Sequence, residues 1–225
     1  MSVALITGGS AGLGRALVEA LSEQDWSVIT DARGGERLAA VSAPTVTRVV
    51  GDVSDPAHRA ALVAQVERLG RLDLLVHNAS TLGPLPLQPL REVSQQDLAR
   101  TWQVNAAAPL ALTCALLPWL RTAAGLVIAL SSDAAVEQYP TWGAYGASKA
   151  ALDHLTLTLG AEEGLTAYAV DPGDMRTAMQ QDAFPGEDIS DRPEPATVVP
   201  AFLELVRRRP PSGRYRAADL APVAV

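Results

Sequence analysis

Six short apolar runs, each followed by a helical pattern, constrain the fold of this chain more than any other feature. Apolar strands that alternate with helices are typical of a parallel sheet covered by helices on both faces. A length of 225 residues suits one domain. We therefore predict a single α/β domain with a doubly wound parallel sheet. The runs span residues 2–7, 26–31, 45–50, 72–77, 125–130 and 165–170, and residues 214–217 are a candidate edge strand.

In sheets of this kind, ligands bind outside the carboxyl ends of the strands. A glycine, a proline or a polar residue ends or follows each of the six runs. We therefore expect one crevice to be lined from six strand ends, by Gly8, Asp31, Asp52, Asn78, Ser132 and Pro172.

The first run leads into the turn Gly8-x-x-x-Gly12-x-Gly14, which opens a helical pattern. Glycine lets the backbone approach a pyrophosphate closely, and free N–H groups at a helix N-terminus bind its negative charge. The turn therefore predicts a dinucleotide site, although its spacing differs from G-x-G-x-x-G.

The second run ends in Asp31-Ala32-Arg33. An acid at this place would bind the ribose 2′-OH of NAD, and an arginine would accept the 2′-phosphate of NADP. Asp31 and Arg33 point the same way if the strand continues through both. A solvated pair of loop residues is the alternative.

Lys149 is the only lysine, because the other 17 of the 18 basic residues are arginines. An ammonium is a compact charge with a tunable pKa, unlike a guanidinium. Tyr145 precedes Lys149 by four residues, so both side chains would lie on one face of a helix. We predict that they point into one pocket. The alternative is a surface lysine beside a half-buried tyrosine.

The net charge of −7 argues against a nucleic-acid partner. The single Cys114 excludes an internal disulfide and lies in an apolar run, where we expect it to be buried. His58, His77 and His154 show no ligand spacing, so no metal is predicted.

The longest uncharged and mostly apolar run, residues 106–120, is too short to span a bilayer and contains two prolines. No basic segment precedes the first apolar run. We therefore expect a cytoplasmic protein with no membrane partner. Asn105 lies inside a long helical stretch, residues 94–120, where its amide is either a packing group or a functional one.

Over essentially its full length, the chain resembles the short-chain dehydrogenase/reductase family. The similarity rests on Thr7-Gly8-x-x-x-Gly12-x-Gly14, Asp52-Val53, Asn78-Ala79, Asn105, Ser132, Tyr145, Lys149 and Pro172-Gly173-x-x-x-Thr177, in this order. His77 and Ser80 depart from the family's strand-four motif, and we expect them to alter loop support rather than chemistry. Of the adjacent Ser131 and Ser132, the resemblance favours Ser132.

The resemblance implies a Rossmann fold and an NAD(P)(H)-dependent oxidoreductase acting on a carbonyl or a secondary alcohol. Tyr145 would be the acid or base, and Lys149 would lower the phenol pKa and bind the nicotinamide ribose. Ser132 would hold the substrate oxygen, and Asn105 would position a water that links Lys149 to solvent. Two rival readings are a catalytically silent nucleotide-binding regulator and an isomerase or dehydratase with tightly bound NAD.

The resemblance favours NADP(H), because Arg33 falls where NADP-selecting enzymes carry an arginine. Asp31, and the lack of a basic residue at Ala11, favour NAD(H), which stays possible. The implied cofactor contacts are Thr7, Gly8, Ser10, Gly12, Leu13, Gly14, Asp31, Arg33, Asp52, Val53, Asn78, Ala79, Tyr145, Lys149, Pro172, Gly173 and Thr177.

The expected substrate is a small neutral carbonyl or alcohol beside an apolar wall of Leu82, Leu85 and Leu87. Residues 175–195 lack periodicity and would form a substrate loop or lid. Their acidic side chains would repel anionic substrates or would simply form a solvated surface. Relatives usually assemble through two long helices, which implies a homodimer or a homotetramer.

Overall fold

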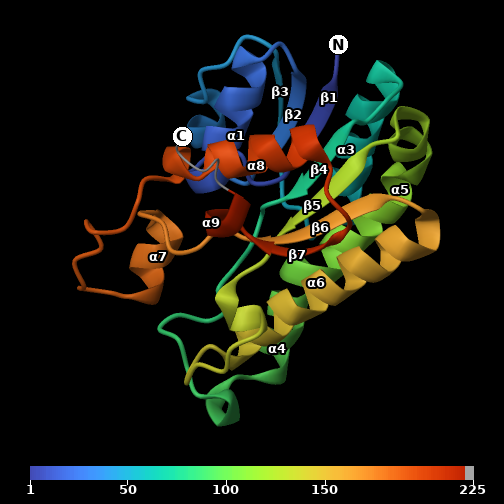
Figure 1. The fold of residues 1–225 in the computed structure, drawn as a ribbon. Helices are drawn as coiled ribbons and strands as arrows, with labels where there is room; N and C mark the ends of the chain where they lie inside the picture. The colour runs from blue at the N-terminus through green and yellow to red at the C-terminus, as the bar shows by residue number, and fades with distance from the viewer. Residues whose placement is uncertain (221–225) are drawn as a thin grey trace.

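A seven-stranded, fully parallel sheet with the order β3-β2-β1-β4-β5-β6-β7 forms the centre of the molecule (Figure 1). The structure, a computed structural model, describes residues 1–220. The predicted doubly wound α/β domain is confirmed, and the candidate edge strand is β7. The strands are β1 Val3–Ile6, β2 Ser27–Ala32, β3 Val46–Val50, β4 Leu74–His77, β5 Leu126–Leu130, β6 Thr166–Asp171 and β7 Gly213–Arg216.

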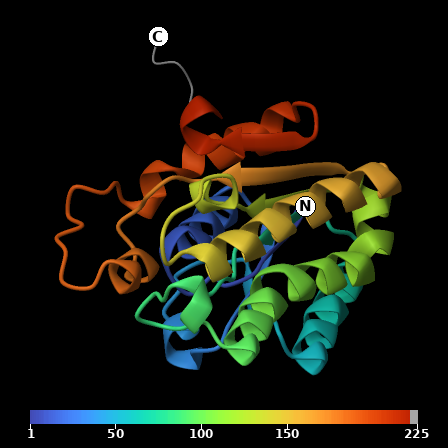
Figure 2. The same cartoon turned by 90° about the horizontal axis from the view of Figure 1, so that it is seen from below.

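Helices cover both faces of the sheet. One apolar core joins the sheet to α1 and α8, and a second joins it to α3 and α5. Figure 2 shows α3, α5 and α6 side by side on the second face. The α-helices are α1 Gly12–Glu23, α2 Gly35–Ala39, α3 Pro56–Leu69, α4 Gln95–Trp102, α5 Ala108–Ala123, α6 Gly143–Glu163, α7 Ala178–Ala183, α8 Val199–Arg208 and α9 Ala217–Leu220.

The long helical stretch predicted over residues 94–120 is divided by a π-helical turn, Gln103–Ala107, between α4 and α5. The run Gln95–Ala123 is long enough to cross a membrane, and its most apolar window of 18 residues has a mean hydropathy of 1.3, so it passes a test of length and composition alone. However, 44% of its most apolar window is buried inside the protein, and α5 contributes Leu112, Leu116 and Leu120 to the core. The run is therefore explained as a core helix.

The expected burial of Cys114 was wrong. Cys114 is exposed, because it lies on the face of α5 opposite the buried Leu112, Leu116 and Leu120. Residues 175–195, which lack periodicity in the sequence, contain the short helix α7.

Candidate active site

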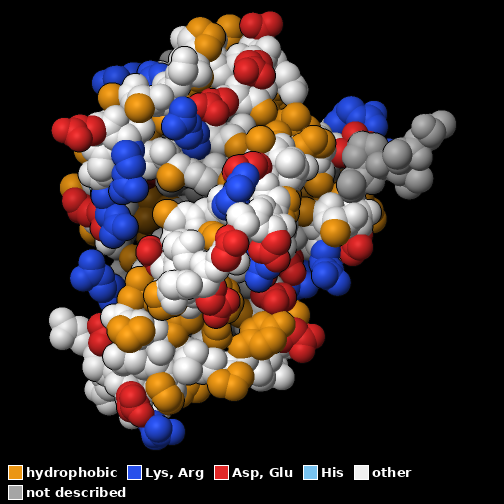
Figure 3. All heavy atoms as spheres, turned by 90° about the vertical axis from the view of Figure 1, so that its left-hand side faces the viewer, with side chains coloured by type: hydrophobic (Ala, Val, Ile, Leu, Met, Phe, Trp, Pro, Cys, Tyr) orange, Lys and Arg blue, Asp and Glu red, His pale blue; other side chains and the backbone are white. Residues whose placement is uncertain are grey.

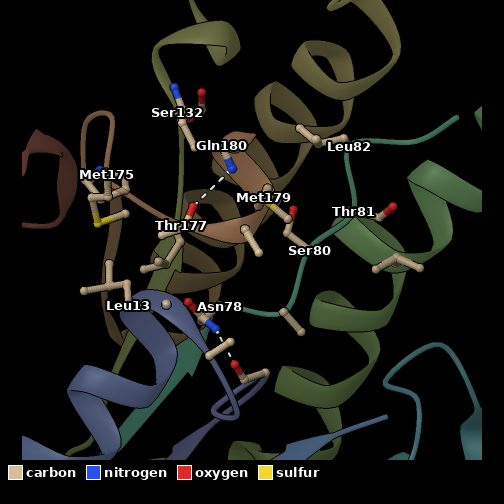
Figure 4. Close-up of a pocket in the computed structure, with 18 of the residues that line it drawn as sticks. Leu13, Asn78, Ser80, Thr81, Leu82, Ser132, Met175, Thr177, Met179 and Gln180 are labelled. Carbon is tan, nitrogen blue, oxygen red and sulfur yellow. Dashed lines mark hydrogen bonds between the residues drawn. The ribbon is translucent and has the colours of Figure 1, made fainter. Parts of the chain in front are cut away.

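A cavity of about 420 Å³ lies at the carboxyl ends of the strands, where the sequence predicted a crevice. Figure 4 shows α7 with Thr177, Met179 and Gln180 on one side of it and Ser80, Thr81 and Leu82 on the other. The predicted site residues that line it are Gly8, Ser10, Gly12, Leu13, Asp31, Arg33, Asp52, Val53, Asn78, Ala79, Ser132, Tyr145, Lys149, Pro172, Gly173 and Thr177. Thr7, Gly14 and Asn105 do not line the cavity.

Thr7 and Gly14 hold the glycine turn against the residues that follow β4. The Nδ2 atom of Asn78 donates to the main-chain oxygens of Thr7 and Gly8, at 2.8 and 3.0 Å. The hydroxyl of Thr7 accepts from the amides of Asn78 and Ala79, both at 3.1 Å. A Cβ atom at Gly14 would lie 2.3 Å from the Asn78 amide nitrogen, so only glycine allows this approach.

The start of α1 is suited to a phosphate group. Gly8 and Gly12 adopt positive φ values of 72° and 54°, which turn the chain into the helix. No side chain of the described residues caps α1, and its first turn carries no acid. Its free N–H groups therefore remain available to an anion, and the turn fits a dinucleotide pyrophosphate.

Asp31 lines the cavity, but its carboxylate is bonded to the protein interior. Its Oδ1 accepts a hydrogen bond of 2.7 Å from the Gly8 amide. Its Oδ2 lies 2.8 Å from Nε2 of the buried His58. Arg33 points to the same cavity and is exposed.

Two further arginines that sequence reasoning missed, Arg37 and Arg100, also line the cavity. Together with Arg33, they form no ion pair with another residue in the described range 1–220. Asp52 lines the same cavity. Partial burial by itself would raise the pKa of Asp52. Hydrogen bonds from the amide and hydroxyl of Ser54, together with the charges of Arg33 and Arg100, outweigh burial and lower this pKa.

Tyr145 and Lys149 lie together on α6, as predicted, and both are buried. The Nζ atom of Lys149 lies 5.6 Å from the centre of the Tyr145 ring. Burial lowers the pKa of Lys149 to about 8, and Asp153 opposes this shift.

Burial also raises the pKa of Tyr145 well above its usual range. A hydrogen bond with Ser132 opposes the shift, whereas Asp133, Asp171 and Asp153 add to it. Burial therefore sets the direction of the shift in the protein without cofactor, and the expected lowering of the phenol pKa by Lys149 and the oxidised nicotinamide stays a prediction.

Ser131 and Ser132 both line the cavity, and Ser132 is the more exposed of the two. Ser131 is buried, and its hydroxyl donates a 2.6 Å hydrogen bond to Asp153. Arg214 of β7 braces this region, because it donates to the main-chain oxygen of Ser132 at 2.8 Å and to Asp153 at 3.2 Å. Sequence reasoning missed Asp153 and Arg214. The spacing of Lys149 and Asp153 on α6 was the only available signal for Asp153.

Asn105 is completely buried, and both ends of its amide are engaged by the protein. Its oxygen accepts from the Thr81 amide at 2.9 Å and from Ser80 at 3.2 Å. Its nitrogen donates to the Thr81 oxygen and the Ser148 hydroxyl, both at 2.8 Å. The side chain thus joins the π-helical turn to α6 and to the loop after β4, rather than facing the cavity.

His77, one of the two departures from the strand-four motif, supports the local structure. The buried His77 lies 2.6 Å from the Thr113 hydroxyl, which ties β4 to α5. Burial lowers the pKa of His77 to about 3, and the charge of Lys149 adds to this shift. His77 is therefore neutral at physiological pH.

An apolar cluster surrounds Tyr145 at the cavity. The Trp142 ring meets the Tyr145 ring edge-on at 5.6 Å, and Leu82 packs in the same cluster. Leu87 lies against this cluster, but Leu85 is exposed and does not line the cavity. Val104, Met175 and Met179 extend the apolar lining. Trp142, Val104 and Met179 were not predicted.

Three comparisons identify the protein's relatives. A model of the short chain dehydrogenase family matches residues 2–188. The uncharacterized oxidoreductase YIR035C of Saccharomyces cerevisiae is 36% identical over 185 residues, which cover 79% of this chain and 72% of the relative. The benzil reductase ((S)-benzoin forming) IRC24 of the same yeast is 32% identical over 199 residues, which cover 80% and 74%.

A crystal structure of a short chain dehydrogenase from Escherichia coli CFT073, complexed with NADPH, has a TM-score of 0.86 and 30% identity. The alignment covers 96% of each chain. The parallel sheet and the glycine turn agree with these matches. The chain therefore belongs to the short chain dehydrogenase family, and it is an NAD(P)-dependent oxidoreductase acting on carbonyl or alcohol groups.

Proposed function

We propose that this protein is an NADPH-dependent reductase of small, neutral and largely apolar carbonyl compounds. The observation that carries the proposal is the position of Tyr145, which lines the cavity with its ring centre 5.6 Å from the Trp142 ring and 5.6 Å from Nζ of the buried Lys149. A raised phenol pKa keeps the proton on Tyr145 until it is needed, which suits an acid that protonates a carbonyl oxygen.

In this mechanism, the Ser132 hydroxyl and the Tyr145 phenol hold the carbonyl oxygen, and Tyr145 donates its proton to that oxygen. Lys149 stabilises the phenolate that forms, because its ammonium is held close to the ring by burial and by its hydrogen bond to Leu130. The nicotinamide supplies the hydride when it is bound. Asn105 fixes the π-helical turn against α6 and is a supporting residue in this proposal.

The adenosine end supports NADPH over NADH. Arg33 and Arg37 are exposed at this end of the cavity and have no ion-pair partner among residues 1–220. A 2′-phosphate would supply that partner, because guanidinium groups bind phosphate well. The relative that was crystallised with NADPH supports the same preference.

The apolar lining supports a neutral substrate. The acidic side chains between residues 182 and 194 are exposed and do not line the cavity. Figure 3 shows acidic and basic side chains interspersed over the face that carries α7. The benzil reductase relative makes aryl ketones the first substrates to assay. Met175 and residues 177–180, which line the cavity, would form the moving part of the predicted lid.

We further propose a cytoplasmic homodimer or homotetramer. The outer face of α5 exposes Ala111, Cys114 and Ala115, and such small side chains suit close packing of a second subunit.

A paired assay with NADPH and NADH, across a panel of neutral aryl and alkyl ketones and aldehydes, tests the function. We expect NADPH oxidation with benzil or a related ketone. Binding of NADPH without turnover of any carbonyl would favour the silent regulator. Product formation without net NADPH consumption, from a protein that purifies with NAD bound, would favour the isomerase or dehydratase.

A further inference from the structure

The acidic residue at the carboxyl end of β2 is turned away from the site where it was expected to act. The Asp31 side chain is 1% exposed. Its two oxygens lie 2.7 Å from the Gly8 amide and 2.8 Å from Nε2 of His58. The carboxylate is thus bonded on both sides by the protein itself.

His58 belongs to α3, and its ring is fixed by its surroundings. It is buried, and its Nδ1 side faces the Gly51 backbone so closely that a Cβ atom there would lie 2.1 Å away. Gly51 precedes Asp52 at the end of β3. The pair of Asp31 and His58 therefore connects the glycine turn to the loop after β3, and both segments line the cavity.

The position of the carboxylate bears on the choice of cofactor. A free acid at the end of the second strand binds the ribose 2′-OH of NAD and repels a 2′-phosphate. Here His58 bonds Asp31 inside the protein, and Arg33 and Arg37, which follow β2, line the cavity with guanidinium groups that are free of ion pairs within residues 1–220. Asp52 after β3 lines it too, but two hydrogen bonds from Ser54 engage its carboxylate.

We propose that His58 is a specificity-determining residue for the cofactor. Its hydrogen bond holds the Asp31 carboxylate inward against the Gly8 amide, so that the chain accepts NADP(H) although it carries an acid at the end of β2. This inference rests on the proposed preference for NADPH.

The test measures cofactor affinity, not turnover, so it needs no substrate. The dissociation constants of NADPH and NADH are measured with the full-length chain by calorimetry and by tryptophan fluorescence, since Trp142 lines the cavity. In His58→Leu, the released carboxylate should reduce the preference for NADPH over NADH at least tenfold. In His58→Gln, an amide can still donate to Asp31, and the preference should persist. His154→Leu, an exposed histidine of α6, is the matched control.

The double variant His58→Leu/Asp31→Asn separates charge from structural damage. Removing the carboxylate should restore the preference for NADPH, which a merely disturbed loop would not do. Asp31→Asn alone should shift the preference less than twofold, because an amide can keep both internal bonds. This single variant also decides the question if His58→Leu does not fold. A tenfold gain in NADPH preference in Asp31→Asn would show that the carboxylate already faces the cofactor and would overturn the inference.

The two proposals fail separately. A wild-type preference for NADH would contradict the proposed cofactor. A wild-type preference for NADPH that is unchanged in a folded His58→Leu variant would contradict the role of His58 alone.

Discussion

The Nζ atom of Lys149 donates a hydrogen bond of 2.8 Å to the main-chain oxygen of Leu130. Leu130 is the last residue of β5, directly before Ser131 and Ser132. The bond therefore fixes α6 against the strand end that leads into Ser131 and Ser132. It also partly compensates the burial of an ammonium that is only 2% exposed.

Replacing Tyr145 with phenylalanine should abolish turnover while the cofactor still binds. The loss of a general acid lowers kcat by about 100- to 10,000-fold. Steady-state kinetics and NADPH titration measure the two effects. Tyr215→Phe on β7 is a control, because this residue does not line the cavity. Retention of most activity in Tyr145→Phe would reject the assigned role.

Lys149 should make stability rise with pH above neutrality. Its folded-state pKa of about 8 lies below the ordinary value of 10.5, so between these values the unfolded chain holds a proton that the folded chain has released. The free energy of unfolding therefore increases with pH across this window. From pH 7 to 9.5 the gain is about 2 kcal/mol.

Denaturant unfolding of wild type and Lys149→Met at both pH values checks this prediction. The variant should lack the gain, because methionine does not titrate. The raised pKa of Tyr145 acts in the opposite direction above pH 10, so measurements stay below that pH. Equal pH dependence in the two proteins would contradict the lowered pKa of Lys149.

Replacing Arg33 with alanine should weaken NADPH binding by about 10- to 100-fold, because a charge-assisted hydrogen bond contributes about 1.5–3 kcal/mol. NADH binding should change much less, since it lacks the 2′-phosphate. Arg91→Ala, an exposed arginine away from the cavity, is the control. If the ratio of the two dissociation constants does not change, Arg33 does not select the cofactor.

Asn105→Ala should lower the free energy of unfolding by about 2–4 kcal/mol, because it removes both hydrogen bonds to the Thr81 backbone and one of the two made by the buried Ser148 hydroxyl. Gln103→Ala, an exposed residue of the same π-helical turn, should cost far less. Chemical denaturation of both variants measures the difference. A stable Asn105→Ala protein with reduced kcat would instead support a direct part in proton transfer.

Ala115→Glu should dissociate the proposed oligomer, because a charge buried in a small-residue interface is not compensated. Ala60→Glu, an exposed alanine of α3, is the matched control and should leave the assembly intact. Sedimentation velocity distinguishes the species. A monomeric wild type, or an unchanged assembly in Ala115→Glu, would argue against association through α5.

The fold and the approximate position of the site were predictable because they depend on local rules. Alternating strands and helices dictate a parallel sheet, and the carboxyl ends of parallel strands meet at one edge. The four-residue spacing of Tyr145 and Lys149 places them on one helix face by geometry alone. The glycine turn was readable because backbone conformation at Gly8 and Gly12 excludes most other residues.

Only the tertiary structure decided which side chains are free to act. Asp31 is engaged by His58, which lies 27 residues away, and Ser132 is braced by Arg214, 82 residues away. Such partners come from elements that become neighbours only when the sheet is assembled, so no local pattern reveals them. The same reason explains the exposure of Cys114 and the raised pKa of Tyr145, because burial depends on the packing of whole elements. The sequence by itself thus determined the fold and the position of the site at the strand ends. The packed structure determined which side chains are buried or engaged by partners, and hence the direction of their pKa shifts.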